Sequence, residues 1–375
     1  MTTGPLDVVL TRAPDLAQVL QDLVSRDEVL EVLRDVADTP APSQLSASTR
    51  GPVIARLIES WNLAGSPKVV LDRHRTGAVT ISSQIARTRL VAHLDEVSYL
   101  LTRPTADGWE LAAFCYHLAD GPRPARAIRG YADGRWDIVA TGRVQGDGDR
   151  LLFIPETTVE DLGPGDRVAL YSPVAATPQG QVTGSLDNAA GVVSVLFAIR
   201  VLAALDLPYD ALLPDEEEGP AGGSSQTISR GAIRALRDAA PADLTVVVDT
   251  HGLPPGLPED QARHERGWGA SLAEFSSAVR GSAVPPGLYR WISATAQQLR
   301  GVDAVIEPNI GGYVPRSDDV AAMLYSRAIT LLGYPGSNRH FDHDLPVSHL
   351  DDLVHLARSL AGIAAAIELA EDVPA

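Results

Sequence analysis

The apolar positions along the first hundred residues fall into helical and strand-like runs. Residues 14–38 carry apolar side chains at helical spacing, with acids and arginines between them, and a second amphipathic run covers 49–61. The Pro-containing segment 39–44 separates the two. Further on, 68–81 and 88–103 alternate with the period of strands, so each predicts a pair of short strands. The chain therefore begins with helices and continues into a sheet.

The pattern changes between residues 107 and 183. Short alternating segments are separated there by Gly, Pro and Asp, and no long helical period interrupts them. This spacing is typical of an all-β unit. We predict a small β-domain at 107–183, inserted into a larger domain that is formed by 1–106 and 184–375.

From Ser185 onward, helical and strand patterns alternate. Helices are predicted over 188–205, 227–238, 284–299, 317–327 and 350–370, and strands over 208–213, 244–249, 302–306 and 328–333. Such alternation predicts an α/β sheet that is covered by helices. The Pro- and Gly-rich stretch 253–283 is expected to be a long loop near the functional site.

Composition restricts the class of protein further. A chain of 375 residues with 45% apolar residues can bury a large core without disulfides, and its single cysteine, Cys115, fits a reducing compartment. The start of the chain lacks the pattern of a secretory signal, and charges interrupt every apolar window before it reaches bilayer length. We therefore expect a cytoplasmic protein without a membrane segment. The net charge of −17 disfavours nucleic acid as a partner.

Four consecutive acids, Asp215 to Glu218, follow a predicted strand and Pro214. Crowded carboxylates repel one another and are costly to desolvate, so such a run forms either a solvated turn or a cation site. The usual exposure of Asp and Glu favours the turn when the run is considered alone. Possible ligands elsewhere in the chain favour the cation site.

These possible ligands stand at the ends of apolar runs or at the start of a helix. His93 and Asp95 lie on one side of a predicted strand because their spacing matches its period of two. Asp187 precedes a helix, Asp249 ends a largely apolar strand, and His340 occurs late in the chain. Open α/β sheets bind ligands at the carboxyl ends of their strands, so we expect these side chains to meet at one edge.

The order of these motifs resembles a known family. HLDE, LDNAAG, EEEG, VVVDT and a late histidine are similar in order to the M42 glutamyl/leucyl aminopeptidases, which belong to a clan that includes the M20 and M28 exopeptidases. The resemblance covers nearly the whole chain. It implies a zinc-peptidase-like mixed sheet between helices, with an inserted β-domain of the barrel type.

The resemblance also implies roles for particular residues. Asp187 would bridge two divalent metal ions, and His93 and Asp249 would complete the ligands of one ion. The second ion would take Glu217 and His340.

The same resemblance assigns the catalytic base. Glu216 would be that base, because Gly219 follows it by three positions as in the family's Glu-Glu-x-Gly, and Asp95 would support His93. Zinc is the expected metal, although mixed His and carboxylate ligands also accommodate cobalt and manganese.

Two assignments stay open in the sequence. The four acids allow a shift of one residue, with Glu217 as base and Glu218 as ligand. His343 is an alternative to His340, which is preferred because Asp344 follows it by four residues.

Two further polar residues receive weaker expectations. His251 is expected to be an exposed loop histidine. Asp318, in a family-like Ser-Asp pair, would be a structural or substrate-side residue.

The resemblance implies an aminopeptidase that acts on short peptides and forms a homo-oligomer through the inserted domain. The same ligands would also suit an amidohydrolase or deacylase of a small metabolite, and a catalytically silent member that serves assembly or binding is a third possibility. The sequence contains no Gly-x-Ser-x-Gly, Walker A or His-Glu-x-x-His motif, which disfavours serine hydrolases, P-loop NTPases and gluzincins.

Overall fold

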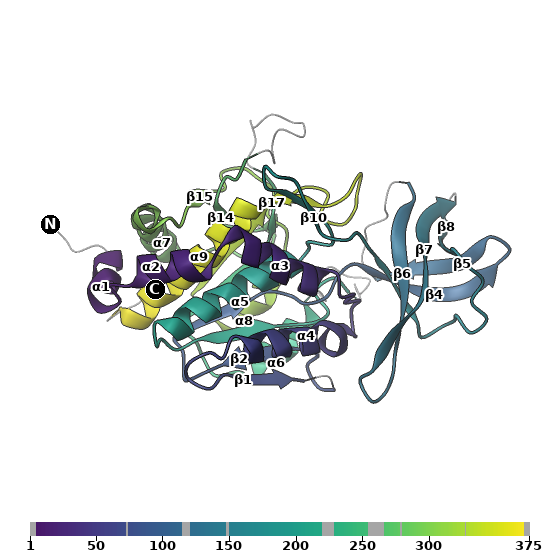
Figure 1. Cartoon of the computed structure of the whole chain (residues 1–375), viewed down its shortest axis with the longest axis horizontal. Coiled ribbons are helices and arrows are strands. Elements are labelled where there is room, and N and C mark those ends of the chain that lie inside the picture. Colours follow the sequence, from purple (N-terminus) through teal and green to yellow (C-terminus); the bar gives the residue numbers. More distant parts are fainter. Residues whose placement is uncertain are drawn as a thin grey trace.

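The protein has a large α/β body and a smaller β-barrel that projects from one end of it (Figure 1). The computed structural model describes residues 5–72, 74–114, 121–147, 150–219, 229–253, 266–277, 280–326 and 328–370. This architecture confirms the predicted fold class. No helix within these residues combines the length and the apolar character needed to cross a bilayer.

The body is built on a mixed sheet. Its described strands are β1 Lys68–Leu71, β2 Val79–Ser82, β3 Thr88–Val91, β12 Asp210–Leu213, β13 Leu244–His251, β14 Ala270–Ala273, β15 Ile306–Pro308 and β16 Ile329–Pro335. They lie in the order β1-β2-β12-β3-β13-β16-β14-β15, and the central strands β12, β3, β13 and β16 are mutually parallel. Their carboxyl ends therefore meet at one edge of the sheet.

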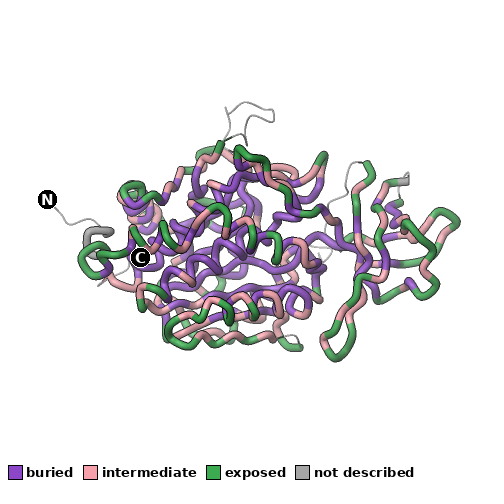
Figure 2. Tube along the Cα trace, in the orientation of Figure 1, coloured by how far each residue is buried: buried purple, intermediate pink, exposed green. Residues whose placement is uncertain are grey.

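Helices cover this sheet. They are α1 Pro5–Arg12, α2 Leu16–Leu23, α3 Arg26–Ala37, α4 Ser46–Ser60, α5 Ala189–Ala204, α6 Arg230–Arg237, α7 Pro286–Leu299, α8 Asp319–Tyr325 and α9 Leu350–Leu369, with a 3-10 turn at Arg300–Val302. Helices α5 and α9 pack against each other, while α6 and α8 form a separate pair that contacts β12, β13 and β16. Every residue of β13 is buried, as expected for a strand covered on both faces, and Figure 2 shows this buried centre.

The barrel is closed by six strands. These are β4 Ser98–Thr105, β5 Gly108–Ala113, β6 Arg123–Gly130, β7 Trp136–Asp147, β8 Arg150–Pro155 and β9 Arg167–Leu170, in the order β4-β5-β8-β7-β6-β9. Its first strand precedes residue 107, where the sequence suggested that the β-domain begins. Strands β10 Ala175–Ala176 and β11 Gln181–Thr183 lie outside the barrel and pair in a small sheet with β17 Val347–His349.

Two contacts fix the chain where the body meets the barrel. Phe341 is buried in the barrel's apolar core, and Nε of Arg123 donates a hydrogen bond to its carbonyl oxygen at 3.0 Å. Glu96, directly before the barrel, forms a buried ion pair with Arg50 of α4 at 2.9 Å. The barrel thereby holds the chain directly after His340, while the Glu96–Arg50 pair fixes the segment between His93 and β4 to α4.

The predicted loop at 253–283 contains a strand. Strand β14 pairs antiparallel with β16 and parallel with β15, so it is an integral part of the sheet. Its sequence, ASLA, has no β-branched or aromatic residue, which explains why its strand character was missed. Residues 254–265 lie outside the described residues.

Candidate metal centre

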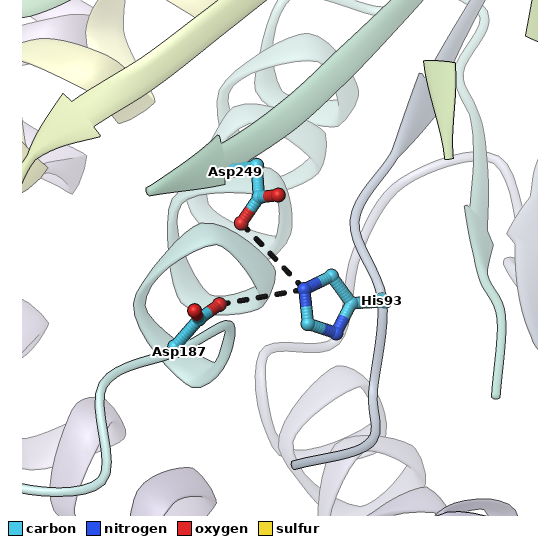
Figure 3. Close-up of side chains that lie close together, drawn as sticks. All are labelled: His93, Asp187 and Asp249. Atoms are coloured by element: carbon cyan, nitrogen blue, oxygen red, sulfur yellow. Dashed lines mark ion pairs between the residues drawn. The ribbon is translucent and has the colours of Figure 1, made fainter. Parts of the chain in front are cut away.

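His93 lies two residues beyond the end of β3 and points into the edge where the parallel strands end. Its Nδ1 donates a hydrogen bond to the main-chain carbonyl of Asp95 at 3.1 Å, which leaves Nε2 as the atom that faces the site. Nε2 lies 3.4 Å from Oδ1 of Asp187 and 3.6 Å from Oδ1 of Asp249 (Figure 3). The three residues come from β3, β13 and the start of α5.

Asp187 lies between two imidazoles. Its Oδ1 faces His93, and its Oδ2 lies 3.4 Å from Nε2 of His340. Both oxygens are buried, and neither accepts a hydrogen bond from the part of the chain that the structure describes. The side chain of the next residue, Asn188, donates to the carbonyl of Val248 at 2.7 Å and so fixes the start of α5 beside β13. The Asp187–Asn188 peptide bond is cis.

The acidic run follows β12 and is shaped by Asp95. The Asp95 carboxylate accepts hydrogen bonds from the main-chain amides of Glu217 at 3.0 Å and Glu218 at 3.1 Å, and from the hydroxyl of Ser43 at 2.6 Å. Glu216 has a φ of +58°, in the left-handed region that non-glycine residues rarely adopt. The backbone turn at Glu216 therefore points the side chains of Glu216, Glu217 and Glu218 in different directions.

Glu216 points away from the cluster. Its carboxylate pairs with Arg234 of α6 at 2.9 Å. Oε2 of Glu217 lies 3.9 Å from Nε2 of His93, and Oε1 of Glu218 lies 2.8 Å from Nε2 of His340. The register first preferred from the sequence, with Glu216 as base and Glu217 as ligand, stays a prediction. Glu216 lies outside the groups of possible ligands, whereas Glu217 forms one with His93 and Glu218.

The late histidine of the cluster is His340. Its side chain is buried between Asp187 and Glu218, whereas His343 is exposed. His340 is held there from the barrel side, because the following residue, Phe341, packs into the barrel core.

The cluster fits divalent cations. Possible ligand atoms lie within 4.8 Å of one another in each of these groups of described residues: His93, Asp187 and Asp249; His93, Glu217 and Glu218; and Asp187, Glu218 and His340. Metal–ligand bonds of 2.0–2.2 Å place neighbouring atoms of a tetrahedral site about 3.3–3.6 Å apart. The spacing around Asp187 is close to that value, and its two oxygens without hydrogen bonds are the pattern expected of a carboxylate that bridges two ions.

Protonation of the histidines reflects the same negative environment. Burial alone would lower the pKa of His340, but the charge of Glu218 and the contacts with the Asp187 and Glu218 carboxylates together outweigh it and raise that pKa to about 9. For His93, burial is likewise opposed by Glu217 and other carboxylates, and its pKa lies well above the usual value. Burial opposes ionisation of Asp187, yet the two histidines lower its pKa well below the usual value. Positive charge is thus favoured at both imidazoles.

Glu217 differs from its neighbours. Its side chain is largely buried, and burial raises its pKa well above the usual range, with further increases from the charges of Glu218, Asp249 and Asp318 and an opposing effect from His93. A carboxyl group with a raised pKa beside cation ligands can accept and return a proton near neutral pH.

The expectation for His251 is wrong, and that for Asp318 stays a prediction. His251, expected in an exposed loop, is the buried last residue of β13, and its Nδ1 lies 2.8 Å from Oγ of Ser271. Burial lowers its pKa to about 3. A Cβ at Gly333 on β16 would collide with the carbonyl of Asp249 and crowd the His251 ring, so glycine is required there. Asp318 is buried at the start of α8, and burial raises its pKa to about 8.

The sequence analysis gave no role to Arg339. This residue directly precedes His340 and lines a small cavity together with Asp187 and Phe341. Its place beside a candidate ligand was the only indication available from the sequence.

Comparison with known proteins gives matches in structure and none in sequence. No protein-family model and no curated protein matches the chain significantly. Aminopeptidase APDkam598 from the archaeon Desulfurococcus kamchatkensis superposes with a TM-score of 0.70 at 17% identity, covering 92% of this chain and 96% of that one. The TET1 peptidase of Pyrococcus horikoshii gives a TM-score of 0.65 at 18% identity, covering 90% and 99%.

A third match agrees with these two. The TET aminopeptidase of Thaumarchaeota archaeon SCGC AB-539-E09 has a TM-score of 0.68 at 15% identity over 90% of this chain and 96% of that one. The chain has the fold of the TET aminopeptidases. This TET-like fold is consistent with the M42 resemblance that the sequence motifs indicated, and at these identities the likeness concerns the fold alone.

Proposed function

We propose that this TET-like protein is a dinuclear metal-dependent exopeptidase that removes N-terminal residues from short peptides. The single observation that carries the proposal is the position of Asp187, which has one carboxylate oxygen 3.4 Å from an imidazole nitrogen on each side. The likeness in fold to aminopeptidases and the order of the sequence motifs support it.

The grouping of His93, Asp187, Asp249, Glu218 and His340 supports a site for two ions. Two divalent ions bound there would polarise a scissile carbonyl and lower the pKa of a bound water. Zinc is the first choice, and cobalt or manganese would suit the same mixture of ligands. We assign Asp187 as the bridge, His93 and Asp249 to one ion, and Glu218 and His340 to the other.

Glu217 is assigned as the general base. Its carboxylate lies beside the ligands, 3.9 Å from His93, and its raised pKa suits a group that takes a proton from water and returns it to the leaving amine. Asp95 is a positioning residue, because its carboxylate holds the amides of Glu217 and Glu218. Glu216 is assigned to neither role, since it pairs with Arg234.

A substrate panel tests the activity. Metal-reconstituted protein is assayed with aminoacyl-anilides, dipeptides and N-acyl amino acids, and we expect turnover of the first two classes. Cleavage of the N-acyl compounds alone would identify a deacylase instead. Two bound ions without turnover of any compound would identify a silent member.

Self-assembly is a further part of the proposal. One solved structure with this fold is described as a dodecamer, and the Pyrococcus horikoshii TET1 peptidase as a tetrahedron or a large octahedral shell. Large apolar side chains are exposed on and before α8, as expected of a contact surface: Ile310, Tyr313, Met323, Leu324 and Tyr325. Light scattering should give a mass several times that of one chain.

A further inference from the structure

Arg339 carries a positive charge at the edge of the metal centre. It is half-buried and lines the cavity that also contacts Asp187 and His340. Its guanidinium carbon lies 5.7 Å from the centre of the Tyr313 ring, within the range of a cation–π contact. The amide of Gly252, just beyond β13, donates to the main-chain carbonyl of Tyr313 at 2.6 Å, so the backbone at Tyr313 lies against the end of β13.

Arg339 differs from the other arginines near the site. Arg234 pairs with Glu216 and Arg50 pairs with Glu96, each at 2.9 Å. Within the described residues, Arg339 forms no ion pair. No carboxylate in the part of the chain that the structure describes takes its hydrogen-bond donors.

The surrounding charges explain why a cation is stable there in the protein without metal. Burial opposes the charge of Arg339, but Asp187, Asp249 and Glu218 raise its pKa. Bound metal ions would engage these same carboxylates. With those carboxylates committed to metal, they would offset the charge of Arg339 less, which would favour an anionic group of the substrate beside the guanidinium.

We propose that Arg339 binds a free carboxylate of the substrate. This inference rests on the proposed exopeptidase function and gives it a substrate class. A planar guanidinium holds a carboxylate through two parallel hydrogen bonds, which a neutral isostere cannot reproduce. The carboxylate has two possible sources: the side chain of an acidic N-terminal residue, or the C-terminal group of a dipeptide.

Two matched pairs of compounds distinguish these sources. Glutamyl-anilide and glutaminyl-anilide differ in the side-chain carboxylate, and Leu-Gly and Leu-Gly-amide differ in the terminal one. Zinc-loaded wild type and Arg339→Gln are assayed with all four compounds, and Arg339→Lys is the variant that keeps the charge. Circular dichroism confirms that each variant folds.

We expect Arg339→Gln to lower kcat/KM about 10- to 100-fold for the carboxylate member of one pair, as for loss of a hydrogen bond to a charged group. The loss should appear mainly as a higher KM. The kcat/KM of the neutral member should change little, and Arg339→Lys should retain part of the activity on the carboxylate member that Arg339→Gln loses. An equal loss on all four compounds, or no loss on any, would overturn the inference.

Binding separates this inference from the proposed function. The four compounds are titrated by calorimetry into zinc-loaded Glu217→Gln protein, with and without Arg339→Gln. If wild type turned over none of the compounds, carboxylate-selective binding that requires Arg339 would still support the inference while the peptidase proposal failed. Turnover without such selectivity would leave the peptidase proposal standing and remove the inference.

Discussion

Nε2 of His340 lies 2.8 Å from Oε1 of Glu218, although the two residues come from segments that follow different strands of the sheet. Strands β12 and β16 end at the same edge, and the barrel fixes the His340 segment through Phe341. In the absence of metal, a proton on His340 neutralises part of the acidic cluster. The Glu218–His340 contact, which the fold sets up, therefore determines how the site responds to pH and to metal.

Metal affinity should rise with pH. The pKa of His340 is about 9, above its unfolded value of about 6.5, so below pH 9 a cation must displace a proton to bind. Zinc affinity should increase up to about tenfold per pH unit for each proton released, between pH 6.5 and 9. Competition with a chelator across this pH range measures the zinc affinity. An affinity independent of pH would count against His340 as a metal ligand.

The same shift predicts how the metal-free protein depends on pH. Because the folded pKa of His340 is raised, its stabilising contribution is complete below about pH 6.5 and disappears as the pH rises through about 9. Urea unfolding of metal-free wild type should show this loss, and His340→Asn should reduce it. If His340→Asn lost as much unfolding free energy between pH 6.5 and 9 as wild type, other groups would be the cause of the pH dependence.

Glu218→Gln should remove a metal ion. The amide would replace a charged ligand opposite His340, so elemental analysis should find about one ion per chain instead of the two expected for wild type. Glu216→Gln is the matched control, since Glu216 pairs with Arg234 outside the cluster. The reverse result, with the control losing the ion, would restore the register first preferred from the sequence.

Glu217→Gln should abolish most turnover without removing metal. Loss of a general base costs about 10²- to 10⁴-fold in kcat. The variant should retain two ions per chain, because Glu217 is not assigned as a ligand. Unchanged kcat on an aminoacyl-anilide would rule out Glu217 as the base.

Asp95→Asn should disturb the acidic turn. The Asp95 carboxylate accepts hydrogen bonds from two main-chain amides and from Ser43, and an asparagine side chain has only one oxygen for this set. We expect about 1–3 kcal/mol of lost stability for the unsatisfied donor, together with weaker metal binding. Ser43→Ala, which removes one donor and leaves the amides bound, should cost less in urea unfolding.

The central elements of the body were predictable because their sequences are unambiguous. Helix α5 was expected at 188–205 and spans Ala189–Ala204, and its apolar residues are buried on all sides. Strand β13 was recognised from its apolar run, which also placed Asp249 at the correct edge. Strand β14 was missed because its small residues resemble a loop until its pairing with β16 is known.

Within the site, the sequence indicated which residue types would meet but not the conformation of the acidic run. The left-handed backbone at Glu216 and the hold of Asp95 on the next two amides depend on contacts between distant segments. The burial of His251 likewise depends on how far β13 extends and on the space beside Gly333. Neither feature follows from local sequence pattern.

The most direct measurement is anomalous X-ray diffraction from crystals of the zinc-loaded protein. The account predicts two zinc ions per chain, with Asp187 bound to both. His93 and Asp249 should complete one ion, Glu218 and His340 the other, and Glu217 should bind neither. A single ion, or an Asp187 carboxylate that contacts only one ion or none, would contradict it.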